Sequence, residues 1–261
     1  MEVELVNKVA IVTGGSKGLG RGIATEMAKA GASVIIASRD SSALNAAKYD
    51  IEKISGREAL VVATDLSNRN SAEACVQAAL MWRGRIDILV NCAGATKRGD
   101  FFELSDQDWE DGYALKLHGA VRMCRAAWPH LIDAKGVVIN IAGVSMRTPT
   151  KDFTIGASVN SALTTFSKSL ADRGIDDGVR VNVINPGYIA SERLDRRVDA
   201  MVESSGKTRD DIYRKLLSGY GVPRFGEPIE IGQLAVFLAS DKASYMHGIA
   251  VDIDGGGSRG Q

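Results

Sequence analysis

A glycine-rich turn close to the N-terminus constrains the fold of this chain more than any other feature of its sequence. Residues 13–20, Thr-Gly-Gly-Ser-Lys-Gly-Leu-Gly, stand between a short apolar run and an amphipathic stretch. A strand, a glycine turn and a helix start in this order present free backbone N–H groups at the positive end of the helix dipole, which suits phosphate. The turn therefore predicts a dinucleotide site. Its expected contact residues are Gly14, Ser16, Lys17, Gly18, Leu19 and Gly20.

The rest of the chain alternates short apolar runs with longer amphipathic ones, which is typical of β-α-β units and a parallel sheet. Strands are expected at residues 8–13, 33–37, 59–64, 86–91, 136–141, 179–184 and 248–253. Helices are expected at residues 19–30, 42–55, 70–83, 106–128, 158–173 and 230–239, with Pro129 as the breaker of the fourth. No repeat, linker or low-complexity tract interrupts the pattern. Residues 1–261 are therefore predicted to form one α/β domain of the Rossmann type, a doubly wound parallel sheet with helices on both faces.

The charge balance excludes several classes of partner. The chain carries 32 basic and 32 acidic residues, so no net field favours nucleic acid or an anionic membrane. No run approaches the roughly 18 apolar residues of a membrane helix, and residues 1–7 lack the features of a signal peptide. The three cysteines and three histidines show no metal-ligand spacing. We expect a cytoplasmic protein without a metal, acting on a small molecule, with neither nucleic acid nor membrane as a partner.

The residues after the second expected strand bear on the choice between the two nicotinamide dinucleotides. NAD binders usually place Asp or Glu at the end of this strand, where it accepts a hydrogen bond from the ribose 2′-hydroxyl. This chain has Ser38 and Arg39 there, and Asp40 comes one position too late. Arg39, with Lys17 from the glycine turn, suits the 2′-phosphate of NADP(H), because a guanidinium matches phosphate geometry. NADP(H) is therefore favoured, and the alternative is that both are solvated surface charges.

Further motifs accompany the glycine turn along essentially the whole chain: Asp65-Leu66, residues 91–94 (Asn-Cys-Ala-Gly), residues 185–187 (Asn-Pro-Gly) and residues 254–256 (Asp-Gly-Gly). Together they identify a resemblance to the short-chain dehydrogenase/reductase family. The resemblance implies about seven strands in the order 3-2-1-4-5-6-7 and a homodimer or homotetramer. It also implies a substrate lid at about residues 188–221, a charged stretch that looks irregular. The cofactor contacts that it adds are Asp65, Leu66, Asn91, Ala93, Gly94, Asn160, Pro186, Gly187, Ile189 and Ser191.

The resemblance fails at the catalytic positions. The family's chemistry normally comes from Asn, Ser, Tyr and Lys, and alignment on the helix of residues 157–170 puts Lys116, Gly143, Gly156 and Asn160 there. Asn and Lys have exchanged places, so one ammonium and one amide could remain in the polar cluster below the cofactor ribose. Our hypothesis is that Lys116 supplies the positive charge and Asn160 bonds the ribose hydroxyls. Drift after a loss of catalysis is the alternative.

No such exchange replaces the other two catalytic side chains. Gly143 and Gly156 leave the usual oxyanion partner and proton donor missing, and general acid–base catalysis is worth roughly 10²–10⁴-fold in rate. Candidate replacement donors are Lys116, Ser145, Lys151 and Tyr188, although Tyr188 could instead be a packing residue at the base of the lid. The candidate catalytic residues are therefore Lys116, Ser145, Asn160 and Tyr188.

These observations leave three functions open. The first is an NADP(H)-dependent oxidoreductase that acts on a carbonyl or alcohol substrate with a non-standard catalytic site. The second is an NADP(H)-binding protein without redox chemistry, acting as a sensor, scaffold or partner subunit, and the third is a non-redox enzyme that reuses the pocket. Loop cations expected at the carboxyl edge of the sheet could attract an anionic substrate, but Asp100 and Asp152 offset them and favour solvated charge. These cations are Lys97, Arg98, Arg147 and Lys151.

Overall fold

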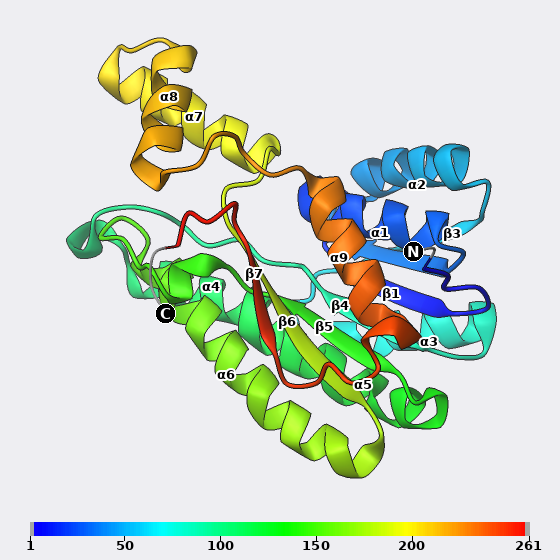
Figure 1. Cartoon of the computed structure of the whole chain (residues 1–261). Helices are drawn as coiled ribbons and strands as arrows, with labels where there is room; N and C mark the ends of the chain where they lie inside the picture. The colour runs from blue at the N-terminus through cyan, green and yellow to red at the C-terminus, as the bar shows by residue number, and fades with distance from the viewer. Residues whose placement is uncertain (1–2, 259–261) are drawn as a thin grey trace.

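The computed structural model describes residues 3–258, in which seven strands form one parallel sheet (Figure 1). The strands lie in the order β3-β2-β1-β4-β5-β6-β7, and every neighbouring pair is parallel, which confirms the predicted order. Both faces of the sheet are covered, so its strands are nearly continuous apolar runs. The strands are β1 Val9–Thr13, β2 Ser33–Ser38, β3 Ala59–Ala63, β4 Ile88–Asn91, β5 Val137–Ile141, β6 Arg180–Pro186 and β7 Ala250–Ile253.

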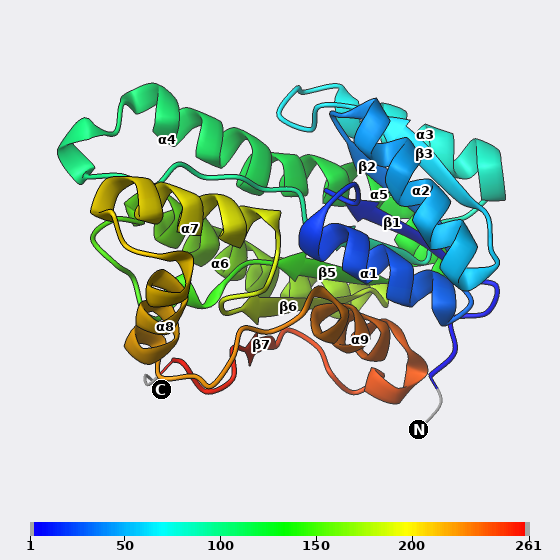
Figure 2. The same cartoon turned by 90° about the horizontal axis from the view of Figure 1, so that it is seen from above.

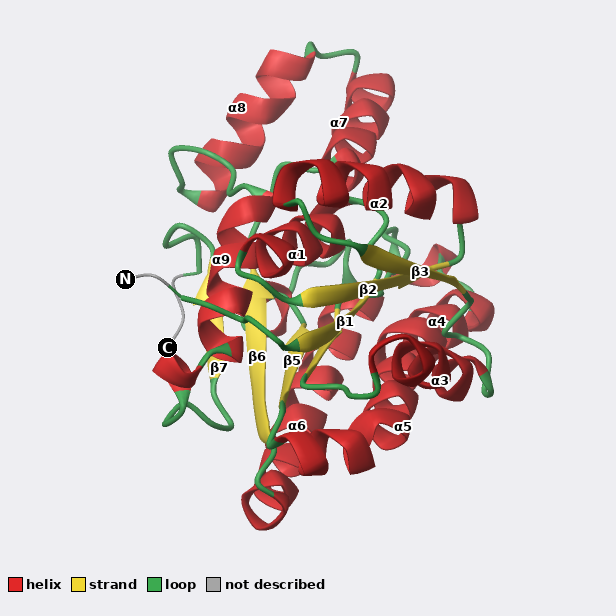
Figure 3. Ribbon diagram, turned by 90° about the vertical axis from the view of Figure 1, so that its right-hand side faces the viewer, coloured by secondary structure: helices red, strands yellow, loops and turns green. Residues whose placement is uncertain are grey.

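Two layers of helices sandwich this sheet, as Figure 3 shows, with α1, α2 and α9 on one side and α3, α5 and α6 on the other. Side chains alternate across each strand, so Ala10 and Val12 of β1 face the first layer and Val9 and Ile11 face the second. The helices are α1 Gly18–Lys29, α2 Ser41–Ser55, α3 Ser71–Arg83, α4 Asp106–Tyr113, α5 Gly119–Ala134, α6 Thr154–Asp177, α7 Glu192–Ser205, α8 Arg209–Tyr220 and α9 Pro228–Ala239.

The predicted helix of residues 106–128 is wrong in two respects. A π-helical segment, Ala114–His118, separates α4 from α5, and the N–H of Gly119 donates to the carbonyl of Ala114 five residues back. Pro129 does not break α5, which continues to Ala134. Pro129 lies on the exposed face, where water can reach the carbonyl that the ring leaves free, while Leu131 extends the buried face beyond it.

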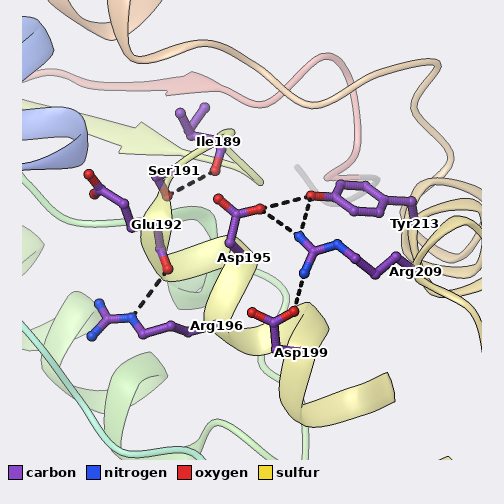
Figure 4. Close-up of polar contacts among 8 residues, drawn as sticks. All are labelled: Ile189, Ser191, Glu192, Asp195, Arg196, Asp199, Arg209 and Tyr213. Carbon is purple, nitrogen blue, oxygen red and sulfur yellow. Dashed lines mark hydrogen bonds and ion pairs between the residues drawn. The ribbon is translucent and has the colours of Figure 1, made fainter. Parts of the chain in front are cut away.

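The stretch at residues 188–221 is helical, not irregular. Helices α7 and α8 form a pair that projects above the rest of the molecule in Figure 1, at the end away from α2 and α3 (Figure 2). The pair has its own apolar cluster, and a guanidinium joins its polar sides: Arg209 of α8 pairs with Asp195 and Asp199 of α7 (Figure 4). Each of the two helices has only a short apolar stripe among many charged residues, so the sequence pattern did not predict them. The cluster consists of Leu194, Val198, Ile212 and Leu216.

Smaller shifts of helix and strand ends affect the site. Helix α6 begins at Thr154, four residues earlier than expected, so Gly156 lies in its first turn. Strand β6 extends through Pro186, which places residues 187–191 directly after the sheet edge. Across residues 3–258, we find no helix long and apolar enough to span a membrane.

Candidate functional site

The glycine turn has the geometry that an anion site requires. Gly14 and Gly18 adopt φ values of +71° and +51°, in the left-handed region that favours glycine. A Cβ on Gly20 would lie 2.2 Å from the carbonyl oxygen of Gly14, so only glycine allows α1 to begin this close to the turn. Lys17, the N-cap of α1, makes no side-chain capping hydrogen bond, which leaves the first N–H groups of the helix to a ligand. The residues present therefore fit a bound pyrophosphate.

The neighbouring strand end is held against this turn. The hydroxyl of Thr13 accepts hydrogen bonds from the N–H groups of Cys92 and Ala93, both at 3.0 Å. Asn91, buried at the end of β4, donates to Asn140 of β5 at 2.9 Å. Strands β1 and β4 are adjacent where the strand order reverses, and such a switch point opens the crevice in which ligands of this architecture bind.

The end of β2 carries the charges expected at the adenosine side. Asp40 is the N-cap of α2 and accepts from the N–H of Ala43 at 3.0 Å, so its carboxylate is occupied by the helix start. Lys17 Nζ lies 3.9 Å from the second Asp40 oxygen. Although burial opposes it, hydrogen bonds from Ser67 and the charge of Arg39 lower the pKa of Asp65. The structure thus brings Lys17, Arg39 and Asp65 to one region.

A cavity of about 420 Å³ lies beside the turn and holds all four candidate catalytic residues in its lining. The loop after β6 forms another wall, so the cavity joins the cofactor side to the space under α7 and α8. Lys151 is exposed on the turn before α6 and is not among the lining residues. The expected site residues in the lining are Leu19, Lys116, Ser145, Asn160, Pro186, Gly187, Tyr188, Ile189 and Ser191.

Lys116 enters the cavity from the π-helical segment. Its Nζ donates to the carbonyl of Ala142 at 3.0 Å. Its alkyl chain lies over Gly94, where a Cβ would come 2.9 Å from the Lys116 Cδ. Burial, together with the positive charge of Arg193, lowers the pKa of Lys116 from 10.5 to about 7. Lys116 therefore exchanges its proton close to neutral pH.

Asn160 and Ser145 lie around the same backbone segment. The amide Nδ2 of Asn160 donates to the hydroxyl of Ser145 at 2.8 Å. A Cβ on Gly143 would lie 2.9 Å from this Nδ2, so Gly143 is what allows the amide to come so near. The amide oxygen of Asn160, Oδ1, is buried without a hydrogen-bond partner among residues 3–258. Residues 142–143 thus bring Lys116, Asn160 and Ser145 to one place.

A polar network fixes the backbone at Gly143. Its N–H donates to the buried side chain of Asn185 at 3.2 Å, and Asn185 donates in turn to Asp252 of β7 at 2.9 Å. Arg147 pairs with the same carboxylate at 2.9 Å. Arg147, expected as a free loop cation, is therefore a structural residue of this network.

The space beside Gly156 is filled by another residue. A Cβ on Gly156 would lie 2.0 Å from the ring of Phe153, so the ring rests directly on the glycine backbone. The guanidinium of Arg98 covers the ring at 3.6 Å and pairs with Asp152 at 3.0 Å. Sequence reasoning missed Phe153, because a contact between residues three apart at a helix start depends on which way the loop enters the helix.

Tyr188 packs among other aromatic rings. Its ring lies 4.8 Å from that of Tyr220 and 6.2 Å from that of Phe225, and the guanidinium of Arg197 lies 4.9 Å above it. This environment favours the packing role that we weighed for Tyr188, although the residue also lines the cavity.

Comparisons with known proteins agree with this geometry. A family profile described as Enoyl-(Acyl carrier protein) reductase matches residues 14–258. The 3-oxoacyl-(acyl-carrier-protein) reductase FabG of Chlamydia trachomatis is 33% identical over 253 residues, with 97% of this chain and 98% of the relative covered. Oxidoreductase UcpA of Escherichia coli is 31% identical, with 97% and 95% covered.

Among solved structures, L-sorbose reductase from Gluconobacter frateurii, complexed with NADPH and L-sorbose, superposes with a TM-score of 0.95. The two proteins are 31% identical, and the match covers 100% of both chains. YwfH, an NADPH-dependent reductase, superposes with a TM-score of 0.89 at 28% identity, over 97% of this chain and 99% of that one. The chain belongs to the short-chain dehydrogenase/reductase family.

Proposed function

We propose that this chain binds NADP(H) in the crevice beside the glycine turn and transfers a hydride between it and a carbonyl or alcohol substrate. In the proposal, Lys116 carries the proton in place of the family's tyrosine. The observation that carries it is the position of Lys116: its ammonium lines the same cavity as the loop after β6, with a pKa lowered to about 7. A proton donor with a pKa near the working pH is the most effective acid–base catalyst.

The residues for the cofactor are those that the turn and the crevice present. The N-terminus of α1 receives the pyrophosphate, Arg39 and Lys17 receive the 2′-phosphate, and the unpartnered Asn160 Oδ1 accepts from a ribose hydroxyl. When bound, the reduced nicotinamide supplies the hydride. Two structural neighbours are described with NADPH, which supports the choice of dinucleotide.

The protein's own part in the reaction is to hold the carbonyl and to protonate its oxygen. In the reduction direction, Lys116 gives a proton to the oxygen as the carbon gains the hydride, and the product is an alcohol. Ser145, held by Asn160 at 2.8 Å, donates a hydrogen bond to the same oxygen. Between turnovers, the ammonium is oriented by the carbonyl of Ala142. Helices α7 and α8 are proposed to cover the bound substrate as a lid.

One observation favours the second candidate, an NADP(H)-binding protein without redox chemistry. The ring of Phe153 rests on Gly156, so no ionisable side chain occupies the place of the family's tyrosine. In this case the dinucleotide binds and no carbonyl or alcohol turns over. The homodimer or homotetramer implied by the family remains a prediction for either function.

The experiment measures the affinity for NADPH and for NADH, and then the loss of NADPH absorbance across a panel of carbonyl compounds. We expect NADPH to bind more tightly than NADH. We also expect Lys116→Met to reduce turnover by roughly 10²–10⁴-fold without lowering the affinity for NADPH. Lys53→Met, which removes an exposed lysine at the end of α2, is the matched control and should leave turnover unchanged. Tight NADPH binding with no turnover on any compound would replace this proposal by the second candidate.

A further inference from the structure

The substrate side of the cavity is lined by positive charge. Four cationic side chains belong to its lining, and none of the described residues that line it is acidic. Lys116 serves the reaction in our proposal, and Arg193 is exposed with its guanidinium 3.5 Å from Thr96. The remaining two, Arg98 and Arg197, come from separate segments, the loop after β4 and helix α7.

One carboxylate serves both of these guanidiniums. Asp152 lies 3.0 Å from Arg98 and 3.9 Å from Arg197, through the same carboxylate oxygen. Its other oxygen accepts from Thr150 at 2.6 Å. The Nη1 of Arg197 is buried and has no hydrogen-bond partner in the part of the chain that the structure describes. Two positive charges therefore share one negative charge, and one buried donor is left unsatisfied, which is costly unless a ligand completes it.

Aromatic rings hold the two guanidiniums in place. Arg98 stacks on Phe153 at 3.6 Å, and Arg197 lies over Tyr188 at 4.9 Å. Stacking on a ring leaves the edge of the guanidinium plane free to donate. The first stack exists because Gly156 has no side chain in the way of Phe153. The position that lacks the family's tyrosine thus supports an arginine instead.

We propose that Arg98 and Arg197 bind a carboxylate group of the substrate, so that the chain acts on a small oxo acid or on the corresponding hydroxy acid. The reaction itself rests on the proposed function: the carbonyl carbon gains the hydride, its oxygen gains the proton, and the carboxylate is unchanged. A monoanion matches the single excess charge of the pair, and guanidiniums pair with carboxylates through two parallel hydrogen bonds. Because the cavity of about 420 Å³ also receives the nicotinamide, the acid must be small.

The test measures binding without turnover. The protein saturated with NADP⁺, which has no hydride to give to an oxo acid, is titrated calorimetrically with 2-oxo, 3-oxo and 4-oxo acids of four to six carbons, each beside its methyl ester. We expect at least one acid to bind roughly ten- to hundredfold more tightly than its ester, the range expected for hydrogen bonds to a charged group. Arg197→Gln should abolish this preference, and Arg197→Lys should retain part of it, because the charge remains but the planar fork is lost.

Arg196→Gln is the matched control, since Arg196 is exposed on the same helix and its Nε donates only to the backbone of Glu192 (Figure 4). Arg98→Gln is the second variant, for the case that Arg197→Gln does not fold. An equal affinity for every acid and its ester would overturn the proposal. So would an equal loss of the acid preference in Arg196→Gln, or a phosphate monoester that binds more tightly than the acids. An acid preference without hydride transfer would refute the proposed function and leave the carboxylate site standing.

Discussion

We expect Lys116 to lower the stability of the folded chain. Its pKa falls from 10.5 to about 7 in the folded chain, because burial and Arg193 disfavour the charged form. At about 1.4 kcal/mol per pKa unit, this corresponds to a cost on the order of 5 kcal/mol for keeping the ammonium charged below neutral pH. Replacing Lys116 by Met also removes its hydrogen bond to Ala142, worth about 1 kcal/mol. The variant should therefore be more stable than the wild type by up to about 4 kcal/mol at about pH 6.

The sign of the pH dependence follows from linkage. Between about pH 7 and pH 10 the unfolded chain holds a proton on Lys116 that the folded chain has lost, so this group makes the wild type more stable as the pH rises. The advantage of Lys116→Met should fade over the same window. Urea unfolding of both proteins at about pH 6 and about pH 9 measures the difference. A variant that is less stable than the wild type at the lower pH, or a difference that is the same at both, would refute the buried-ammonium argument.

Three further perturbations test other parts of the structure. Arg39→Ala should weaken NADPH roughly ten- to hundredfold and leave NADH nearly unchanged, by fluorescence titration, because the guanidinium is assigned to the 2′-phosphate. Gly156→Ala should destabilise the fold by about 1–3 kcal/mol in thermal unfolding, since its Cβ meets Phe153 at 2.0 Å; the added substitution Phe153→Ala should restore part of the loss. Arg209→Ala should speed proteolysis at residues 206–208, where α7 joins α8, and unchanged cleavage would show that the apolar cluster alone holds the pair.

The sheet was predictable because burial on both faces makes each strand an apolar run. Strand β2, Ser33–Ser38, is one such run, and its position was predicted to within a residue. Helix ends depend on contacts with distant parts of the chain, which the hydrophobic periodicity of the sequence does not reveal. Helix α5 continues past Pro129 because Leu131 is buried beyond it. The helices of residues 188–221 were not predicted for a related reason: each has only a narrow apolar stripe, and that stripe packs against the stripe of the other helix.

In the candidate site, too, some features could be predicted from the sequence and others could not. The glycine turn was predictable, because its conformation and its function depend on the same residues, and Gly14 and Gly18 have the left-handed φ values that explain them. The place of Lys116 in the cavity was inferred only through the family resemblance. The stack of Arg98 on Phe153 depends on a space that opens only in the folded chain, so no pattern in the sequence indicates it.

The length of the π-helical segment Ala114–His118 determines whether Lys116 reaches the cavity. A π turn holds one residue more than the α-helical turn that it replaces, and this residue widens the turn without changing the angular phase of the helices on either side. Removing one residue from it would let α4 and α5 fuse into one regular helix. The buried face of α5, with Met123 and Ala127, would stay in the core, and the wider turn that carries Lys116 into the cavity would be lost. The reach of the ammonium thus depends on the length of this segment as well as on its composition.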